Sequence, residues 1–201
     1  MARATFPRLS PSTARRAELH YSLGDYLLDA VQNSVEAGAA HIELRVEERA
    51  GRLTLTVIDN GPGMDAATLA RAQDPFFTAE GKHPERRVGL GLPFLKQLAE
   101  TCDGTMVIES APGRGTTVRV DMAADHTDLP PRGELAVVFQ QALCFSGTFD
   151  LVVERTRDSD GYRVSRAELV DALGEIETVG SQALVQDYFS AREAELEHTE
   201  D

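Results

Sequence analysis

The sequence predicts an α+β fold, a two-layer sandwich in which a mixed but mainly antiparallel sheet carries helices on one face. Apolar and polar residues alternate over 42–47 and 53–59, which is typical of half-buried strands, and a short turn around Gly51 joins them. A stretch with helical periodicity begins at Ser22, before this pair. The expected order is helix, hairpin, helix, loop, helix, hairpin, and consecutive strands with short turns favour antiparallel pairing.

Local signals give the individual elements in order. Ser22 and Asp25 have the spacing of a capping box, so the first helix is expected to begin there, and Gly38 provides its left-handed stop. A second hairpin is expected around the turn at 112–115, whose two glycines permit tight geometry. The other elements are expected as helices at 66–73, 92–102, 134–145 and 181–195, strands at 105–110, 116–122, 149–156 and 162–164, and a helix capped by Ser165 with Glu168.

Composition divides the chain into three parts. Residues 1–18 are basic, contain proline and lack a hydrophobic period, so they are expected to form a disordered tail, with a phosphate-binding arm as the alternative. Composition changes again at 126–133, which contains a pair of prolines. We therefore expect a main domain at 19–125 and a small α/β accessory domain at 126–201.

Charge and hydropathy exclude several classes of function. The net charge of −13 argues against a broad nucleic-acid surface. No apolar run approaches the roughly 18 residues that span a bilayer, so no membrane partner is expected. Cys102 and Cys144 lack the spacing of metal ligands and are expected to be buried thiols. The expected location is the cytoplasm.

Asp29 and Asn33 are four residues apart and share one face of the first helix. An amide oxygen beside a carboxylate can ligate Mg²⁺ and orient a water molecule. Taken alone, the same pair could be two ordinary surface residues of an amphipathic helix.

The segment DNGPGM at 59–64 directly follows a predicted strand. The carboxylate of Asp59 could accept a hydrogen bond from an exocyclic amine, and the glycines would let the backbone approach a flat purine. A plain turn is an equally good interpretation, because Asn-Gly and Pro-Gly pairs form turns.

A pair of glycines in the segment VGLGLP at 88–93 opens a predicted helix. Gly89, Leu90 and Gly91 would then present backbone N–H groups to an anion at the helix N-terminus. Lys82 and Arg87 lie just upstream, on a stretch at 78–87 without hydrophobic period, and could close over phosphates as a lid. A solvated charge run is the alternative.

Together, these segments resemble the GHKL ATPases, the family of DNA gyrase, histidine kinases and MutL. Over 19–122 the order is that of the family: QNSVEAGA resembles the N box, DNGPGM the G1 box, DPFFT the F-type segment, VGLGLPFLKQLAE the G2 box and GRGTTVRV the closing strand. Several motifs in the right order are far more specific than one glycine motif. The resemblance implies the Bergerat fold and assigns 19–125 as the ATP-binding domain.

The resemblance also implies a role for each matching residue. Asn33 would bind Mg²⁺, with Asp29 as the catalytic carboxylate, and Asp59 would bind the adenine amine. The other implied contacts are Gly61 and Gly63 to the base, Gly89, Leu90 and Gly91 to the phosphates, and Thr116 to the adenine through a water.

Two departures from the family pattern stand out. Hydrolytic members carry glutamate where this chain has Asp29, and many sensor kinases carry glycine where it has Arg87. The likeness extends over nearly the full length to small stand-alone histidine-kinase-like ATP-binding proteins, some of which accompany hydrogenase genes. No dimerisation helix with a phosphoacceptor histidine precedes the ATP-binding segment, so a complete sensor kinase is not expected.

The expected function is Mg²⁺-dependent ATP binding by a histidine-kinase-like regulatory module that phosphorylates a separate partner protein on histidine or serine. Two alternatives remain open at this stage. One is a slow ATPase that works as a conformational switch, and the other is an ATP-sensing module without turnover. The ATP site alone does not distinguish them, because related sites on one fold serve different activities.

Overall fold

The computed structural model describes residues 22–74 and 91–198. Within these ranges the chain forms six helices and six strands. The elements are α1 (Leu23–Glu36), β1 (His41–Arg49), β2 (Arg52–Asp59), α2 (Ala66–Ala72), α3 (Gly91–Thr101), β3 (Thr105–Ser110), β4 (Thr116–Ala123), α4 (Leu135–Leu143), β5 (Asp150–Arg157), β6 (Asp160–Ser165), α5 (Arg166–Leu173) and α6 (Val179–His198).

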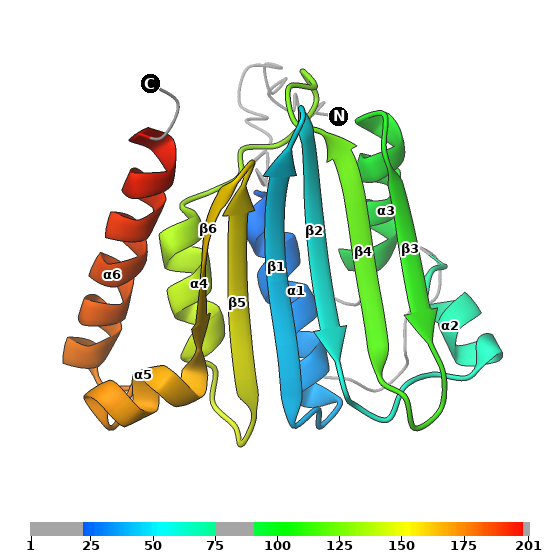
Figure 1. The fold of residues 1–201 in the computed structure, drawn as a ribbon. Coiled ribbons are helices and arrows are strands. Elements are labelled where there is room, and N and C mark those ends of the chain that lie inside the picture. Colours follow the sequence, from blue (N-terminus) through cyan, green and yellow to red (C-terminus); the bar gives the residue numbers. More distant parts are fainter. Residues whose placement is uncertain (1–21, 75–90, 199–201) are drawn as a thin grey trace, which may run out of the picture.

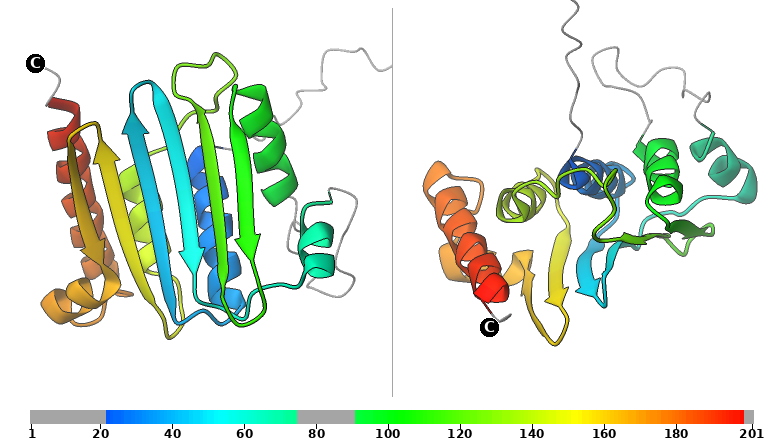
Figure 2. Two further views of the ribbon diagram at one scale, coloured as in Figure 1. Left: turned by 45° about the vertical axis from the view of Figure 1, so that its right-hand side comes forward. Right: turned by 90° about the horizontal axis from the view of Figure 1, so that it is seen from above.

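All six strands belong to one sheet, in the order β3-β4-β2-β1-β5-β6. The pair β1–β5 is parallel and the other four neighbouring pairs are antiparallel. Helices α1, α3, α4 and α6 cover one face of the sheet (Figure 1), and the view from above shows the two layers (Figure 2). The predicted two-layer α+β sandwich is therefore confirmed.

The first helix begins at the predicted cap. The backbone N–H of Asp25 donates to the Ser22 hydroxyl at 3.2 Å, and the Ser22 N–H donates to the Asp25 carboxylate at 2.7 Å. Gly38, with φ of 82°, follows the last turn, as the left-handed stop requires. The side chains of Leu27 and Val31 face the sheet and are buried.

The core lies between the helices and the sheet. Ile42, Leu44 and Val46 of β1 alternate with partly exposed residues, as the sequence pattern predicts. The buried apolar side chains of β2, β4 and β5 continue the same layer: Leu53, Leu55, Val57, Val120, Met122, Leu151 and Val153. Because inward-facing residues recur at every second position, the register also fixes which side chains at the strand ends face the helices.

Residues beyond 126 complete this sheet instead of forming a second one. β5 pairs with β1 over its whole length, from His41 opposite Asp150 to Glu48 opposite Arg157. Helix α4 packs against both α1 and α6, and its buried side chains belong to the same hydrophobic cluster as those of α1. The proline-containing segment at 126–133 therefore connects two parts of one core.

A buried arginine fastens the C-terminal helix to this sheet. Arg155 of β5 has a side chain that is only 2% exposed, and it forms ion pairs with Glu48 of β1 and Glu193 of α6. Its guanidinium also donates to the backbone carbonyl of Thr156 at 2.7 Å. A buried charge is costly unless it is paired and hydrogen-bonded, and each of these contacts offsets part of that cost.

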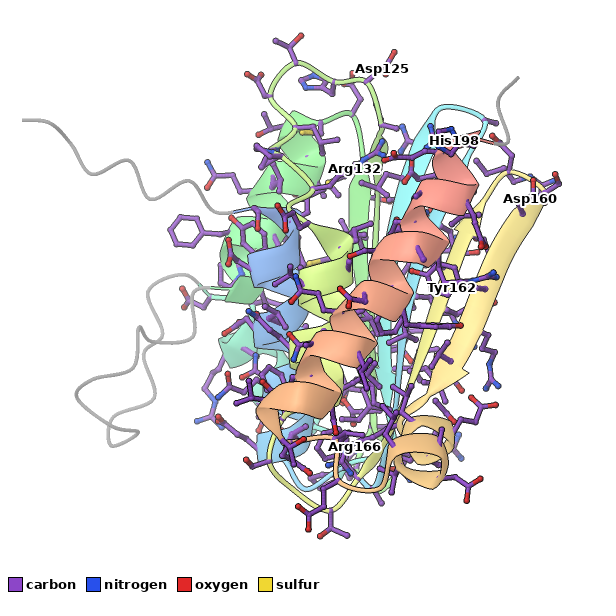
Figure 3. The ribbon with its side chains drawn as sticks, turned by 90° about the vertical axis from the view of Figure 1, so that its left-hand side faces the viewer. Asp125, Arg132, Asp160, Tyr162, Arg166 and His198 are labelled. Carbon is purple, nitrogen blue, oxygen red and sulfur yellow. The ribbon has the colours of Figure 1, made fainter. Side chains whose placement is uncertain are left out.

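Two further residues complete the network. Arg132, in the segment before α4, forms a 2.8 Å ion pair with Glu48. Tyr162 of β6 donates to Glu193, and burial, followed by this hydrogen bond to the carboxylate, raises the pKa of Tyr162. Figure 3 looks onto α6 and labels both residues beside it. The network thus joins β1, β5, β6, α6 and the connecting segment.

No helix within 22–74 or 91–198 has the length and apolar character needed to cross a membrane.

We expect Arg155→Met to lower the free energy of unfolding by roughly 3 kcal/mol or more, the scale for removing one partner of a buried ion pair. The reason is that the buried Glu48 and the partly buried Glu193 both lose this cation. Arg163→Met, on the exposed side of the neighbouring strand, is the matched control and should change stability by about 0.5 kcal/mol or less. Chemical denaturation measures both, and equal losses would contradict a structural role for the network.

Candidate functional site

The described part of the candidate site lies on the helix side of the sheet, where β2 ends and β4 begins. Asp59 and Thr116 are directly opposite each other in the β2–β4 register. Two residues earlier on β2 and two later on β4, Val57 and Val118 form the next inward-facing pair. By the period of two, Asp59 and Thr116 therefore face the helices. Helix α1 faces this strand end, and α3 begins beside α1.

The Asp59 carboxylate connects the helix layer with the end of the sheet. One oxygen accepts the Ser34 hydroxyl of α1 at 3.0 Å, and the other accepts the backbone N–H of Gly61 at 2.8 Å. An ionised carboxylate has about four lone-pair positions, so Asp59 can accept a further donor from a ligand. The geometry supports the predicted position of an adenine amine.

Ser34 is a site residue that sequence reasoning missed. It is 5% exposed, and its hydroxyl lies 3.0 Å from Asp59 and 3.2 Å from the carbonyl oxygen of Ala30. A charged acceptor gives the stronger bond, so the hydroxyl proton belongs to Asp59. The available signal was the helical spacing, since Leu27, Val31 and Ser34 follow the i, i+4, i+7 pattern of one buried face.

Asn60 stabilises the turn after β2. Its side-chain oxygen accepts the backbone N–H groups of Ala40 at 2.9 Å and His41 at 2.8 Å. The amide oxygen is thus occupied by the start of β1. These two hydrogen bonds hold the segment after Asp59 against the start of β1.

The loop that follows is locked onto the β3–β4 turn. Gly63 has φ of 66°, and a β-carbon at this position would collide with the carbonyl oxygen of Ala111. The N–H of Gly113 donates to the Pro62 carbonyl at 2.7 Å, and the N–H of Met64 donates to the Ser110 hydroxyl at 2.8 Å. The DNGPGM segment at 59–64 and the β3–β4 turn at 112–115 are therefore held against each other.

Asp29 and Asn33 form the second half of the site, on the face of α1 next to α3. The Asn33 amide nitrogen donates to the Asp29 carboxylate at 3.3 Å. Helix α3 begins at Gly91, where a β-carbon would collide with that carboxylate. Desolvation by the surrounding protein raises the pKa of Asp29, and the hydrogen bond from Asn33 opposes this rise.

These side chains fit a magnesium ion that is held mainly by phosphates and water. Mg²⁺ keeps several waters and takes one or two protein oxygens. The hydrogen bond to Asp29 uses the amide nitrogen of Asn33 and not its amide oxygen. No cluster of three or more histidine, cysteine or acidic side chains occurs in the described ranges. The donor set thus matches a nucleotide-bound metal.

The structure brings together seven of the predicted residues. Asp59, Gly61, Gly63 and Thr116 lie at the end of β2, and Asp29, Asn33 and Gly91 lie between α1 and α3. Lys82, Arg87, Gly89 and Leu90, with the predicted lid, lie outside the described residues. Helix α3 begins at Gly91, and the first N–H groups of any helix have no partner within that helix, which suits an anion.

Comparisons with known proteins identify the family of this chain. Residues 21–126 match the family described as histidine kinase-, DNA gyrase B-, and HSP90-like ATPase. The C4-dicarboxylate transport sensor protein DctB of Rhizobium meliloti is 39% identical over 106 residues, which are 50% of this chain and 16% of DctB. The sensor protein kinase FleS of Pseudomonas aeruginosa is 44% identical over 92 residues, covering 45% of this chain and 22% of FleS.

The N-terminal domain of a DNA repair protein has a similar structure, with a TM-score of 0.52 and 17% identity over 78% of this chain and 58% of that one. At this identity the likeness shows the fold alone. The chain spans about a fifth or less of the length of the two sensor proteins. Because the family match extends over more than half of the chain, the protein belongs to the histidine kinase-, DNA gyrase B- and HSP90-like ATPases and carries their ATP-binding domain.

Proposed function

We propose that this protein is a Mg²⁺-dependent ATP-binding module that acts as a regulatory, histidine-kinase-like enzyme on a separate partner protein. One observation carries the proposal: a single helix, α1, supplies both ends of the site. Ser34 holds the Asp59 carboxylate, and Asp29 with Asn33 adjoins the start of α3. Ser34 and Asp29 are five positions apart, which is about 7.5 Å along the helix axis, so one helix can contact both the base and the phosphates of one nucleotide.

The residues of the chain have distinct tasks in this proposal. Asp59 accepts the exocyclic amine of adenine, and Gly61 with Gly63 leaves the backbone open to the ring. The N-terminus of α3 binds phosphate oxygens through its N–H groups. Asn33 contributes an amide oxygen to the metal, and bound Mg²⁺ neutralises charge on the phosphates.

The proposed kinase activity draws on the relatives, because similar segments occur in sensor proteins, and FleS is a sensor protein kinase. In the transfer, a nucleophilic side chain of the partner bonds to the terminal phosphorus, and the bond from that phosphorus to the bridging oxygen of ADP breaks. The histidine or serine proton leaves to solvent or a base. Since this reaction consumes ATP, we propose that the protein works in the cytoplasm.

Slow hydrolysis is the second candidate, and the position of Asp29 beside Asn33 and the start of α3 favours it. A carboxylate with a raised pKa is a better general base than an ordinary aspartate. Asp29 lies beside Asn33 and the start of α3, where an attacking water could be held. Water would then take the place of the partner side chain, and the products would be ADP and phosphate.

Incubation of the protein with γ-labelled ATP and a host lysate separates these functions. A labelled partner band that is absent with the Asp59→Asn variant supports phosphotransfer. Released phosphate without a labelled band supports the hydrolytic switch. Tight ATP binding with neither product would overturn both in favour of a sensing module.

Asp59→Asn should weaken ATP binding by about 1.5–3 kcal/mol, the scale for a hydrogen bond to a charged group. The substitution removes the negative acceptor and turns one position toward the ligand into an N–H donor. Calorimetry with ATP and GTP measures the effect. Asp65→Asn is the control, because Asp65 caps α2 beside the same loop and asparagine caps a helix equally well. Equal affinity of the unmodified protein for ATP and GTP would contradict the assignment of Asp59.

Asn33→Ala should abolish the gain in affinity that Mg²⁺ gives to ADP, while metal-free ADP binds nearly as before. The expected reason is that Asn33 meets the metal and Asp59 meets the base. Titrations with and without Mg²⁺ test this, and Gln32→Ala on the neighbouring helix position is the control. A large loss of metal-free binding would instead make Asn33 a structural residue.

Asp29→Asn should reduce turnover about 10²–10⁴-fold if Asp29 is the general base. A base works in its deprotonated form, so the rate should rise with pH through the pKa of Asp29. Because this pKa is raised, the acid limb should lie at higher pH than for an ordinary aspartate. The variant should lose that limb. A pH–rate profile of unchanged shape would show that Asp29 is not the base.

A further inference from the structure

One hydroxyl group in the wall of the site has all of its hydrogen-bonding capacity in use. Ser110, the last residue of β3, accepts the backbone N–H of Met64 at 2.8 Å. Its own proton points to the carbonyl oxygen of Gly115 at 3.0 Å. The Thr116 hydroxyl oxygen lies 3.0 Å from the Ser110 hydroxyl oxygen.

These contacts fix the direction of the bond between Ser110 and Thr116. A hydroxyl has one proton and two lone pairs. Ser110 gives its proton to Gly115 and one lone pair to Met64, so its remaining lone pair accepts from Thr116. Thr116 is therefore the donor in this pair. With its only proton used, Thr116 has two lone pairs to offer and no proton.

The direction of the hydrogen bond between Thr116 and Ser110 matters because Thr116 lies opposite Asp59. Thr116 is paired with Asp59 in the β2–β4 register, and both face the helix side of the sheet. An ionised carboxylate also accepts only. The end of β2 and the start of β4 thus present two neighbouring groups that accept hydrogen bonds and cannot donate them.

We propose that Ser110 is a specificity-positioning residue, which turns the Thr116 hydroxyl into an acceptor and so selects purines that carry an amino group at position 6. The inference rests on the proposed ATP site. Adenine carries an amine donor at this position, whereas hypoxanthine and guanine carry a carbonyl. A carbonyl facing two acceptors leaves a desolvated oxygen without a donor, which is the usual source of strong rejection.

A water molecule between Thr116 and the base would transmit the same preference. Such a water would donate one proton to Thr116 and the other to the Asp59 carboxylate. Its lone pairs would then face the base, where an amine donor is again favoured. In this orientation of the water, direct and water-mediated contact select the same group.

Ser110 also braces the loop through Met64, so loss of affinity alone would not reveal its role in specificity. The useful measurement is the ratio of affinities for ATP and ITP in one preparation, because the fraction of folded protein cancels. ITP has the carbonyl at position 6 and no amino group at position 2. In Ser110→Ala, Thr116 regains a free proton and can donate to this carbonyl.

We expect calorimetry to give an ATP-to-ITP affinity ratio that is about three- to tenfold smaller in Ser110→Ala, the scale of one neutral hydrogen bond. Ser110→Thr keeps the hydroxyl and should restore the ratio. Thr117→Ala, on the next residue of β4 and facing the other side of the sheet, should leave it unchanged. If the alanine variant does not fold, Ser110→Cys, with a weaker hydrogen-bonding group of similar size, should shift the ratio in the same direction.

The outcomes separate this inference from the proposed function. If both nucleotides weaken equally in Ser110→Ala, Ser110 is a brace only, and the inference is overturned while the ATP site stands. If the unmodified protein binds neither ATP nor ITP, the proposed function itself fails. A smaller ratio that Ser110→Thr restores supports both.

Discussion

The site depends on one carboxylate that joins two layers of the protein. Asp59 ends β2, accepts the hydroxyl of Ser34 from α1, and accepts the N–H of Gly61 from its own loop. The contact fixes α1 against the end of β2, where the proposed nucleotide would lie. Because Asn33 precedes Ser34 on the same helix, the position of the phosphate end follows from that of the base end. In the proposed site, adenine recognition and metal placement are therefore not independent.

The remainder of the sheet makes this arrangement rigid. β1 and β2 lie in the middle, and β5 with β6 adds to the edge that β1 would otherwise expose. An unpaired edge strand can pair with other chains, and its backbone groups stay exposed to water. Arg155 then ties α6 to this extension through Glu48 and Glu193. The C-terminal segment thus supports β1, which lies beside the site strand β2, without contributing a site residue in the described ranges.

Much of the fold and part of the site could be predicted from the sequence. The caps at Ser22 and Ser165 and the alternation in β1 and β2 are local signals, read within a few residues. The contacts that were missed are distant in the chain. Ser34 and Asp59 are 25 positions apart, Ser110 and Met64 are 46 apart, and Arg155 and Glu48 are 107 apart. Periodicity predicts that a residue faces inward, but the partner it meets depends on strand order.

The lack of a local signal for long-range contacts also explains why a separate accessory domain was expected at 126–201. Prolines at 130 and 131 and the change in composition are real features of the sequence, and they are typical of linkers. The parallel pairing of β5 with β1 leaves no local signal, because it joins segments more than a hundred residues apart. Secondary structure was predictable on both sides of the linker. The continuity of the sheet was not.

Asp29 shows how a departure from a family pattern becomes understandable in three dimensions. Its carboxylate lies against the backbone of Gly91, in the space that any β-carbon at that position would need. The first residue of α3 and the length of the side chain on α1 are therefore coupled. A glutamate would carry its carboxylate further toward α3, and the N-terminus of that helix would have to move to make room. Since the proposed phosphate contacts come from the same N-terminus, the shorter acid keeps α3 close to α1. The identity of residue 29 thus bears on the proposed phosphate binding as well as on the proposed activation of a water molecule. Glycine at position 91 leaves the space that the Asp29 carboxylate occupies beside the start of α3.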